Sequence, residues 1–263
     1  MSAAHPSDLE TLCAIAEAAG REIMAVYASD FAAWSKADAS PLTEADLRAD
    51  TVIRHGLEQA FPGVFILSEE SVSAGPGVAD TFFLVDPLDG TREFLKRNGE
   101  FTVNIALVSG GRPVAGVVLA PAAGELFYAA QGRGAWQRTA AGPVALHAAA
   151  PAPGAALRVI GSRSHGGEAL AGWLAKLQVE YSFVAAGSSL KFCRIAQGLA
   201  DIYPRQGPTC QWDTAAGQAV LEQAGGAVLD TQAEPLRYGL GRPMLNPHFI
   251  AVGNAALPYP ALE

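Results

Sequence analysis

Acidic side chains gather in three short segments that have the pattern of strand ends and helix starts. Glu69 and Glu70 follow one apolar run, and the sequence DPLDGT at 86–91 follows another. Asp213 stands at the beginning of a stretch with helical periodicity. Carboxylates held close together repel one another unless a cation lies among them. Because oxygen ligands suit Mg²⁺, Mn²⁺ or Ca²⁺ better than Zn²⁺, these segments predict a site for a hard divalent cation.

The segment DPLDGT carries the groups that phosphate chemistry needs. Asp86 and Asp89 are three residues apart around a proline turn, so both carboxylates and the Leu88 carbonyl can point into one pocket. Gly90 lets the backbone approach a ligand closely, and Thr91 supplies a hydroxyl where a helix can begin. Amides at a helix start bind phosphate. A phosphate held there, with a cation between it and the carboxylates, is the arrangement for metal-assisted hydrolysis of a phosphate ester.

Each acidic residue also has a purely structural explanation. Asp213 has the position of a helix N-cap, and Asp46 stands three residues after Thr43 in the spacing of a capping box. Glu69 and Glu70 by themselves are compatible with a solvated strand end, and DPLDG with an ordinary turn. All of these features together, each at a strand end or a helix start, favour a functional site.

Composition narrows the class of protein. The 263 residues predict one large domain or two closely joined ones, with 50% hydrophobic and 17% charged residues as in a globular protein. The net charge of −8 argues against binding to nucleic acid polymers or anionic membranes, because it provides no basic field. No transmembrane segment and no secretory signal are expected, since the apolar stretches fall short of the ~20 residues of a membrane helix.

The cysteines bear on the compartment. The chain has three, Cys13, Cys193 and Cys210, and their spacing matches neither a CxxC pair nor a metal site. Free thiols are therefore expected, which suits a reduced compartment. The predicted location is cytoplasmic, with peripheral association at the inner membrane as the alternative.

The elements that position these groups differ between the two halves of the chain. Residues 1–150 predict an α+β subdomain with an antiparallel sheet and most of the acidic segments, and residues 151–263 predict an α/β subdomain that completes the site. The segment 139–154, rich in alanine, proline and glycine, is predicted to be a connection. Apolar periodicity predicts helices over 9–26, 43–61, 168–177, 189–197 and 213–224, and strands over 64–67, 82–85, 101–108, 114–119, 126–129, 157–160, 181–184, 201–203, 227–229 and 249–252.

Four features occur in the order and approximate spacing of a known family: Asp46, the Glu69 and Glu70 pair, DPLDGT at 86–91 and WDTAA at 212–216. This set resembles the magnesium-dependent, lithium-sensitive phosphomonoesterases of the inositol monophosphatase superfamily. The runs SKADASPLTEAD, FLKRNGEFTVNIALV, GSRSH, GSSLKFC and YPRQGPT resemble the bacterial 3′(2′),5′-bisphosphate nucleotidases of the CysQ type. The resemblance covers nearly the whole chain. It implies an α/β protein built as a layered α-β-α-β-α sandwich of the inositol monophosphatase and fructose bisphosphatase type.

The resemblance also implies an activity. An enzyme of this branch hydrolyses the 3′-phosphate of adenosine 3′,5′-bisphosphate to AMP and phosphate with metal-activated water, and so clears a by-product in sulfur metabolism. The phosphosulfate 3′-phosphoadenylyl sulfate is a second candidate substrate. The expected partner is thus a small phosphorylated nucleotide, and the chain is expected to act as a monomer or homodimer.

Two to three Mg²⁺ ions per site are implied by the same resemblance. Glu69, Asp86 and the Leu88 carbonyl would hold the first ion. Asp86, Asp89 and Asp213 would hold the second, with Asp86 shared between the two. A third, weaker ion would lie near Glu69 and solvent.

The resemblance further assigns the catalytic and substrate-binding groups. Thr91 and Asp46 would orient and deprotonate the attacking water, and Glu70 would support that water from behind. Arg92 departs from the lysine that this branch tends to have after the threonine, which affects only the fine geometry of phosphate binding. The substrate-binding set implied is Glu69, Asp89, Gly90, Thr91, Arg92, His165, Ser188, Lys191, Arg205 and Asp213.

A second phosphate on the substrate needs positive partners of its own. Arg163, His165, Lys191 and Arg205 are predicted in loops or at helix starts of the second half, and Ser188 adds a hydroxyl beside them. Relatives specific for inositol phosphates tend to place acidic residues in this region, so the basic set favours the doubly phosphorylated nucleotide. Each basic residue could instead be a surface charge or a helix cap.

Two other functions remain as alternatives. The first is an inositol monophosphatase or a broad-specificity sugar phosphatase on the same scaffold. The second is a sensor that binds a nucleotide without hydrolysing it. Because a sensor would be expected to lack Asp46, Thr91 or a bridging carboxylate, and all are present, the hydrolase is favoured.

Overall fold

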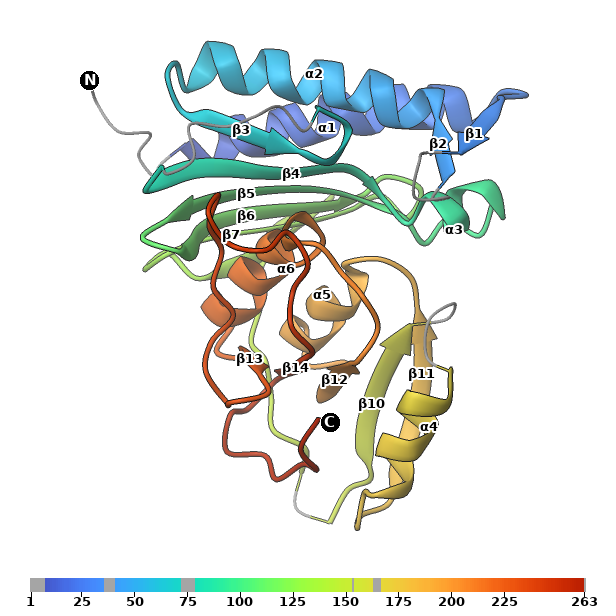
Figure 1. The fold of residues 1–263 in the computed structure, drawn as a ribbon, viewed down its shortest axis with the longest axis vertical. Coiled ribbons are helices and arrows are strands. Elements are labelled where there is room, and N and C mark those ends of the chain that lie inside the picture. Colours follow the sequence, from blue (N-terminus) through green and yellow to red (C-terminus); the bar gives the residue numbers. More distant parts are fainter. Residues whose placement is uncertain (1–7, 36–40, 72–78, 153, 163–166, 263) are drawn as a thin grey trace.

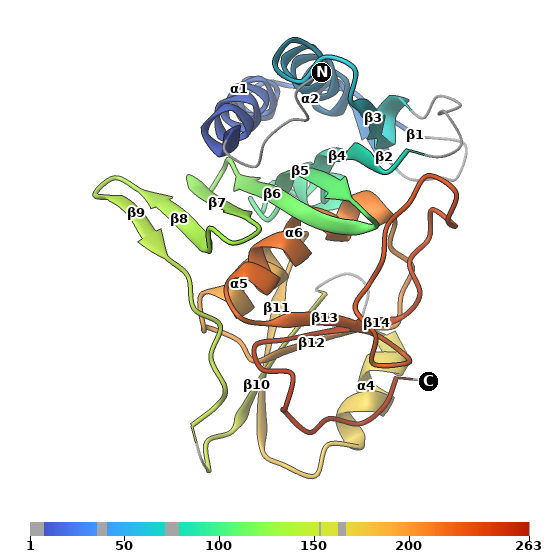
Figure 2. The ribbon, with the colours of Figure 1, turned by 90° about the vertical axis from the view of Figure 1, so that its left-hand side faces the viewer.

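Two β-sheets alternate with three layers of helices through the molecule (Figure 1). The computed structural model describes residues 8–35, 41–71, 79–152, 154–162 and 167–262. One outer face of the larger sheet is covered by a helix pair, another pair lies between the two sheets, and a single helix covers the far side of the smaller sheet (Figure 2). This confirms the predicted α-β-α-β-α sandwich. The helices are α1 (Leu9–Tyr27) and α2 (Glu44–Ala60) outside, α5 (Leu190–Ala196) and α6 (Gln211–Gln223) between the sheets, and α4 (Gly167–Ala175) on the far side.

The larger sheet has seven strands in chain order, so each strand lies beside its predecessor. Its first two strands run parallel and all the later neighbours run antiparallel, so most of this sheet is antiparallel, as expected for the first half of the chain. The strands are β3 (Phe65–Ser68), β4 (Thr81–Asp89), β5 (Thr102–Ser109), β6 (Arg112–Ala120), β7 (Glu125–Ala130), β8 (Ala135–Thr139) and β9 (Gly142–Ala145).

Three details of this half differ from the sequence-based expectation. The connection predicted over 139–154 is wrong at its start, because β9, which begins with Gly142 and Pro143, pairs antiparallel with β8. Glycine and proline are depleted in strands, so these two residues gave no local signal for a strand. Strand β4 continues to Asp89 instead of ending at residue 85, with a register shift between Asp86 and Asp89. A two-stranded ribbon, β1 (Ala33–Ser35) and β2 (Pro41–Thr43), precedes α2 and was not expected.

The smaller sheet has five strands in the order β11-β10-β12-β14-β13. Strand β10 runs parallel to both its neighbours, whereas β14 runs antiparallel to its two, so the sheet is mixed. All five strands were predicted, and they alternate with helices as expected. Their bounds are β10 (Leu157–Ser162), β11 (Tyr181–Ala186), β12 (Ile202–Arg205), β13 (Ala227–Asp230) and β14 (Phe249–Val252).

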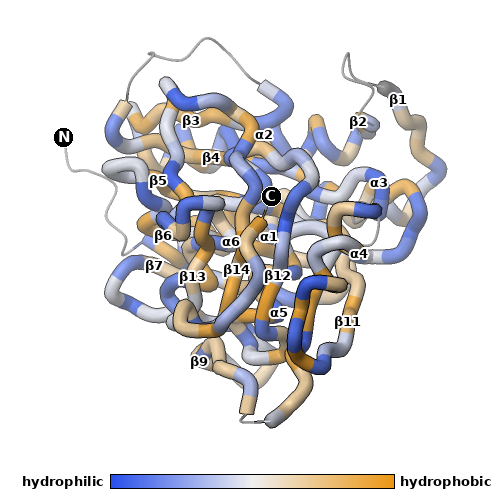
Figure 3. The backbone as a smooth tube through the Cα atoms, turned by 60° about the horizontal axis from the view of Figure 1, so that its bottom comes forward, coloured by the Kyte–Doolittle hydropathy of each residue, from blue (hydrophilic) through white to orange (hydrophobic). Residues whose placement is uncertain are grey.

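Helix α6 joins the two halves, since it belongs to the second half of the chain and packs on the larger sheet. The contact is close because β6 offers a glycine: a Cβ on Gly116 would lie 2.6 Å from the Ala216 carbonyl oxygen of α6. One apolar core runs through α5, α6 and both sheets, and apolar stretches run along the strands in the middle of the molecule (Figure 3). The two sheets and the helices between them are therefore held together by one shared apolar core.

Two further expectations concern compartment. Among the residues described, no helix combines the length and the apolar character that crossing a membrane requires. Cys13 and Cys193 are buried and Cys210 is partly buried, and all three are free, as predicted.

Candidate active site

The acidic segments lie where β3 and β4 end. These two strands are parallel, so their carboxyl ends meet at one edge of the sheet. Glu69 and Glu70 follow β3 in a short 3-10 helix, η2 (Glu69–Ser71), and are partly buried. After β4, Gly90 takes a left-handed conformation with a φ of 92°, which favours glycine, and α3 (Thr91–Leu95) begins at the next residue. The chain thus turns away sharply just behind the last aspartate of β4.

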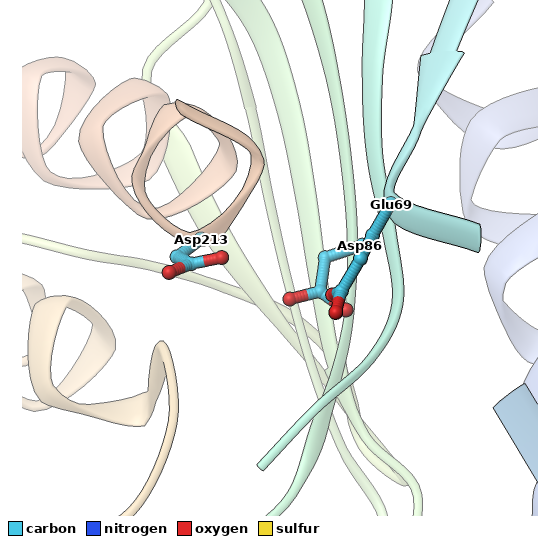
Figure 4. A group of neighbouring side chains, drawn as sticks. All are labelled: Glu69, Asp86 and Asp213. Carbon is cyan, nitrogen blue, oxygen red and sulfur yellow. The ribbon is translucent and has the colours of Figure 1, made fainter. Parts of the chain in front are cut away.

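Three carboxyl groups from both halves of the chain meet at this edge. One oxygen each of Glu69, Asp86 and Asp213 lies within 4.8 Å of the others. Figure 4 shows Glu69 and Asp86 side by side, with Asp213 facing them from the first turn of α6. Asp89 is outside this group of three, but its charge interacts with those of Asp86 and Asp213. We call Glu69, Asp86, Asp89 and Asp213 the acidic wall.

Two aspartates reach the site from the first turn of a helix in the same way. Asp46 is the third residue of α2, where its Oδ2 accepts hydrogen bonds from the Thr43 amide at 2.7 Å and the Thr43 hydroxyl at 2.6 Å. Asp213 is the third residue of α6, and its Oδ2 accepts from the Cys210 amide at 2.8 Å. The capping box at Thr43 is thereby confirmed, whereas the reading of Asp213 as an N-cap is wrong because Cys210 is the N-cap. Capping and a functional role are compatible, since each aspartate has a second oxygen.

The second oxygen of Asp46, Oδ1, contacts Thr91, the residue that follows the turn at Gly90. Thr91 Oγ1 donates to Asp46 Oδ1 at 3.2 Å, and the Leu88 carbonyl lies at the same distance as a second acceptor. Asp46 is only 2% exposed, so its carboxylate has few competing water contacts. The arrangement fixes the threonine hydroxyl at the base of the turn.

Burial and crowding shift the pKa values of the acidic wall. Burial, followed by the charges of Glu69, Asp89 and Asp213, raises the pKa of Asp86 well above its usual value. Burial and the charge of Asp89 do the same to the pKa of Asp213, and burial also raises the pKa of Asp89. The negative charges therefore destabilise one another in the folded protein.

These residues fit a hard divalent cation. The groups that converge are all oxygen donors, the ligand type of Mg²⁺ and Ca²⁺. A cation among them would relieve the repulsion that raises the pKa values of Asp86 and Asp213. The charge of Asp86 interacts with those of Glu69, Asp89 and Asp213, so Asp86 is electrostatically linked to every other member of the acidic wall.

Two cationic side chains, Lys191 and Arg205, also lie at the site, and we call them the basic wall. Lys191 is 5% exposed, and its ammonium donates to the Ser188 carbonyl and lies 5.2 Å from the centre of the Tyr203 ring. Burial lowers the pKa of Lys191 to about 8, although the charge of Asp89 opposes this shift. Arg205, at the end of β12, donates to the carbonyls of Gly207 at 3.2 Å and Pro208 at 2.9 Å. Arg205 is thus on a strand end and not at a helix start.

One cavity of about 260 Å³ is lined by Lys191, Arg205 and three members of the acidic wall, Glu69, Asp89 and Asp213, together with Gly90, Thr91, Arg92 and Ser188. Arg92 itself is exposed on α3. Arg163 and His165 lie outside the described residues. The structure therefore brings together the acidic residues and most of the basic residues that the sequence analysis singled out.

The loop before α5 closes this cavity with an unusual backbone. Gly187 packs so tightly that a Cβ on it would lie 2.5 Å from the Glu100 carbonyl oxygen, and its amide donates to Glu100 Oε2 at 2.9 Å. The next residue, Ser188, is left-handed with a φ of 44°, and its buried Oγ has no hydrogen-bond partner. A polar atom of this kind, on a backbone that serine rarely adopts, is typical of a ligand-binding loop.

Sequence reasoning missed the polar groups behind Asp89. Thr102 and Asn104 of β5, both fully buried, and Ser189, at 1% exposure, surround one oxygen of this carboxylate. Their signal was present in the run FTVNIALV, where two polar residues stand two apart and thus on one face of an otherwise apolar strand.

Comparisons with known proteins agree on one family. The model of the inositol monophosphatase family matches residues 6–257. The 3′(2′),5′-bisphosphate nucleotidase CysQ of Escherichia coli (strain K12) is 45% identical over 248 residues, which cover 92% of this chain and 98% of that protein. The crystal structure of CysQ from Bacteroides thetaiotaomicron has a TM-score of 0.82 at 36% identity, over 95% of this chain and 98% of that one. An inositol monophosphatase from Anabaena (Nostoc) sp. PCC 7120 gives 0.75 at 26% identity, over 95% and 91%.

Proposed function

The chain belongs to the inositol monophosphatase family, and from this premise we propose that it is a 3′(2′),5′-bisphosphate nucleotidase. Its substrate would be adenosine 3′,5′-bisphosphate, with 3′-phosphoadenylyl sulfate as a further candidate, and its products AMP and inorganic phosphate. Relatives that are named for this activity align with 92% of the chain at 45% identity. An inositol monophosphatase would have the same scaffold and the same acidic wall. The choice between the two activities therefore depends on the basic wall.

One observation carries this choice: the cavity that Glu69, Asp89 and Asp213 line is also lined by Lys191 and Arg205. A substrate with two phosphates matches both sides, because one phosphate meets cations at the acidic wall while the other meets fixed positive charges. Inositol 1-phosphate has no second anion for Lys191 and Arg205. The nucleotide would therefore bring a second anion to these two cations, which an inositol monophosphate would not.

Two to three Mg²⁺ ions are proposed as the cofactor. Glu69, Asp86 and the Leu88 carbonyl would hold the first, and Asp86, Asp89 and Asp213 the second. When bound, the ions neutralise the charge of the phosphate and lower the cost of forming hydroxide from water. The third would lie near Glu69, on the more open side of the acidic wall.

The groups of this chain then orient the reactants. The amides of Gly90 and Thr91, at the start of α3, face the phosphate. Because Thr91 Oγ1 donates its proton to Asp46 Oδ1, its lone pairs are free to accept a hydrogen bond from the attacking water. As the new bond to phosphorus forms and the bond to the 3′-oxygen breaks, the water proton moves to Thr91 Oγ1 and the threonine proton to Asp46 Oδ1, while the leaving 3′-oxygen takes a proton from solvent and becomes the 3′-hydroxyl of AMP.

Supporting contacts keep this pair in place. Asp46 Oδ2 is held by both Thr43 donors, so only Oδ1 is turned toward Thr91. Glu70, in η2 next to Glu69, is proposed to hold the water from behind. No covalent intermediate is required by these roles.

The test is the release of inorganic phosphate, with Mg²⁺, from adenosine 3′,5′-bisphosphate and from inositol 1-phosphate in parallel. The proposal predicts a strong preference for the nucleotide. A preference for the inositol ester would overturn the substrate assignment and leave the acidic wall with its role. No phosphate release from either compound, at any Mg²⁺ concentration, would favour the sensor.

A further inference from the structure

Ser189 occupies a place that none of the proposed roles uses. Its hydroxyl is buried between the two halves of the chain, at 1% exposure, just before α5 begins. It donates toward two acceptors: Asp89 Oδ2 lies at 3.0 Å and the main-chain carbonyl of Asp213 at 2.7 Å. One oxygen atom thus touches the last residue of β4 and the first turn of α6.

The hydroxyl is itself fixed from a third direction. Asn104 Nδ2, on β5, donates to Ser189 Oγ at 2.9 Å, and Asn104 is fully buried. A serine hydroxyl has one proton and two acceptor sites, so it can accept from Asn104 while its proton is shared between the two acceptors. Its position is therefore determined by three segments that are far apart in the sequence.

The same contacts decide which way the Asp89 carboxylate faces. Ser189 Oγ, Asn104 Nδ2 and Thr102 Oγ1 all approach Oδ2, at 3.0, 3.4 and 3.5 Å. With Oδ2 held by neutral donors, Oδ1 is the oxygen left to face a cation. Groups behind a metal ligand act in this way, by holding it in one orientation before the ion arrives.

We propose that Ser189 is a positioning residue that sets both the orientation of Asp89 and its separation from Asp213, and that the affinity for Mg²⁺ depends on its hydroxyl. This rests on the proposed function, because Asp89 and Asp213 are metal ligands only there. Ser189 does not touch the substrate. It acts through Asp89 and through the backbone of α6, and Asn104 acts mainly through Ser189, because its own contact with Asp89 is longer.

The test is the dissociation constant of Mg²⁺ measured by calorimetry on the full chain without nucleotide. Ser189→Ala should raise it about tenfold or more, as is typical for the loss of a partner behind a metal ligand. Ser109→Ala is the matched control: it removes a serine hydroxyl from β5, the strand that carries Asn104, where it pairs with Thr81 Oγ1 at 2.9 Å, and should change the constant by less than twofold. Unfolding by urea in the presence of EDTA shows whether either variant has lost stability.

A second pair of variants separates positioning from packing. Asn104→Ala should weaken Mg²⁺ binding less than Ser189→Ala does. Because Asn104 acts mainly through Ser189, the double variant should bind Mg²⁺ only slightly more weakly than Ser189→Ala alone, and not with the sum of the two losses. Should Ser189→Ala not fold, Ser189→Thr, which keeps the hydroxyl, and Asn104→Ala decide the matter: the first should bind Mg²⁺ normally and the second weakly.

The results that would contradict the role of Ser189 differ from those that would contradict the proposed function. A wild-type protein that binds Mg²⁺ and a folded Ser189→Ala variant with an unchanged constant would overturn the role of Ser189. An equal loss in Ser109→Ala would do the same, since the effect would then be general. Failure of the proposed function would show differently, as a wild-type protein that binds no Mg²⁺ or that binds it without hydrolysing the nucleotide.

Discussion

The acidic wall and the basic wall of the cavity hold their charges in opposite ways. Glu69, Asp86 and Asp213 converge on one another, and their crowding raises pKa values. Lys191 and Arg205 instead donate to carbonyls of their own loops, which fixes each cation beside the cavity. The negative charges of the acidic wall repel one another unless cations bind among them. The side chains of the basic wall are already oriented before any ligand binds.

This difference suggests a division of labour. The acidic wall, which needs cations, can bind the metal ions and support hydrolysis of the phosphate that contacts them. A wall with fixed cations can select a ligand by its charge, because the orientation is already established. The four predictions below test this division, beginning with the variant expected to lose most activity.

Asp86→Asn removes the carboxylate placed between the two proposed ions. Phosphate release from adenosine 3′,5′-bisphosphate should fall on the order of 10³-fold, because charge stabilisation at the reacting phosphate is lost. In EDTA the variant should be at least as resistant to urea as the wild type, since the crowding of negative charge is relieved. A variant with more than a tenth of the normal turnover would show that Asp86 is not central to the acidic wall.

Thr91→Val keeps the size of the side chain and removes its hydroxyl. If Thr91 passes the water proton to Asp46, turnover should fall about 10²-fold or more while the affinity for Mg²⁺ changes little. Thr91→Ser, which retains the hydroxyl, should keep most of the activity. Equal losses in the valine and serine variants would mean that the methyl group, and not the proton path, is what matters.

Lys191→Met tests the basic wall alone. It should lower kcat/KM for adenosine 3′,5′-bisphosphate about 10- to 100-fold, and should have a much smaller effect on adenosine 3′-phosphate, which lacks the second anion. Lys176→Met, at an exposed lysine in the turn after α4, is the control and should alter neither. If both substrates lose equally, Lys191 only supports the loop of Ser188 and does not select the substrate.

The pH dependence of stability should give the smallest effect. The raised pKa values of Asp86, Asp89 and Asp213 mean that the folded protein binds protons more tightly than the unfolded chain, whose aspartates titrate near 3.8. In EDTA, the contribution of these groups is therefore present below that pH and is lost as the pH rises through the folded-state values. Saturating Mg²⁺ should flatten this fall, and urea titrations at several pH values measure both curves. A metal-free protein that gains stability from these groups as the pH rises would contradict the sign.

The acidic wall was far easier to predict than the network behind it. Its residues stand in short motifs beside strand ends, and the parallel pairing of β3 with β4 was enough to bring Glu69 to Asp86. Most strands followed from apolar periodicity, and the layer order followed from the family resemblance. The hairpin of β8 and β9 did not, because its pairing is decided by neighbours in the sheet and not by local preference.

Local sequence patterns could not predict the contacts between the two halves of the chain. Asn104 and Ser189 are 85 residues apart and meet only because α5 and α6 pack against the larger sheet. Similarly, Lys191 was expected to reach outward to a phosphate, yet it is buried and tied to the Ser188 carbonyl. Burial depends on the whole fold, so the character of the basic wall was visible only in three dimensions.

The most direct test of the two-wall account follows the reaction of adenosine 3′,5′-bisphosphate by phosphorus NMR. The account places the 3′-phosphate at the acidic wall and the 5′-phosphate at the basic wall. It predicts that the 3′ signal disappears as inorganic phosphate appears, while the 5′ signal of AMP persists. Loss of the 5′ signal first, with adenosine 3′-phosphate as the product, would contradict it.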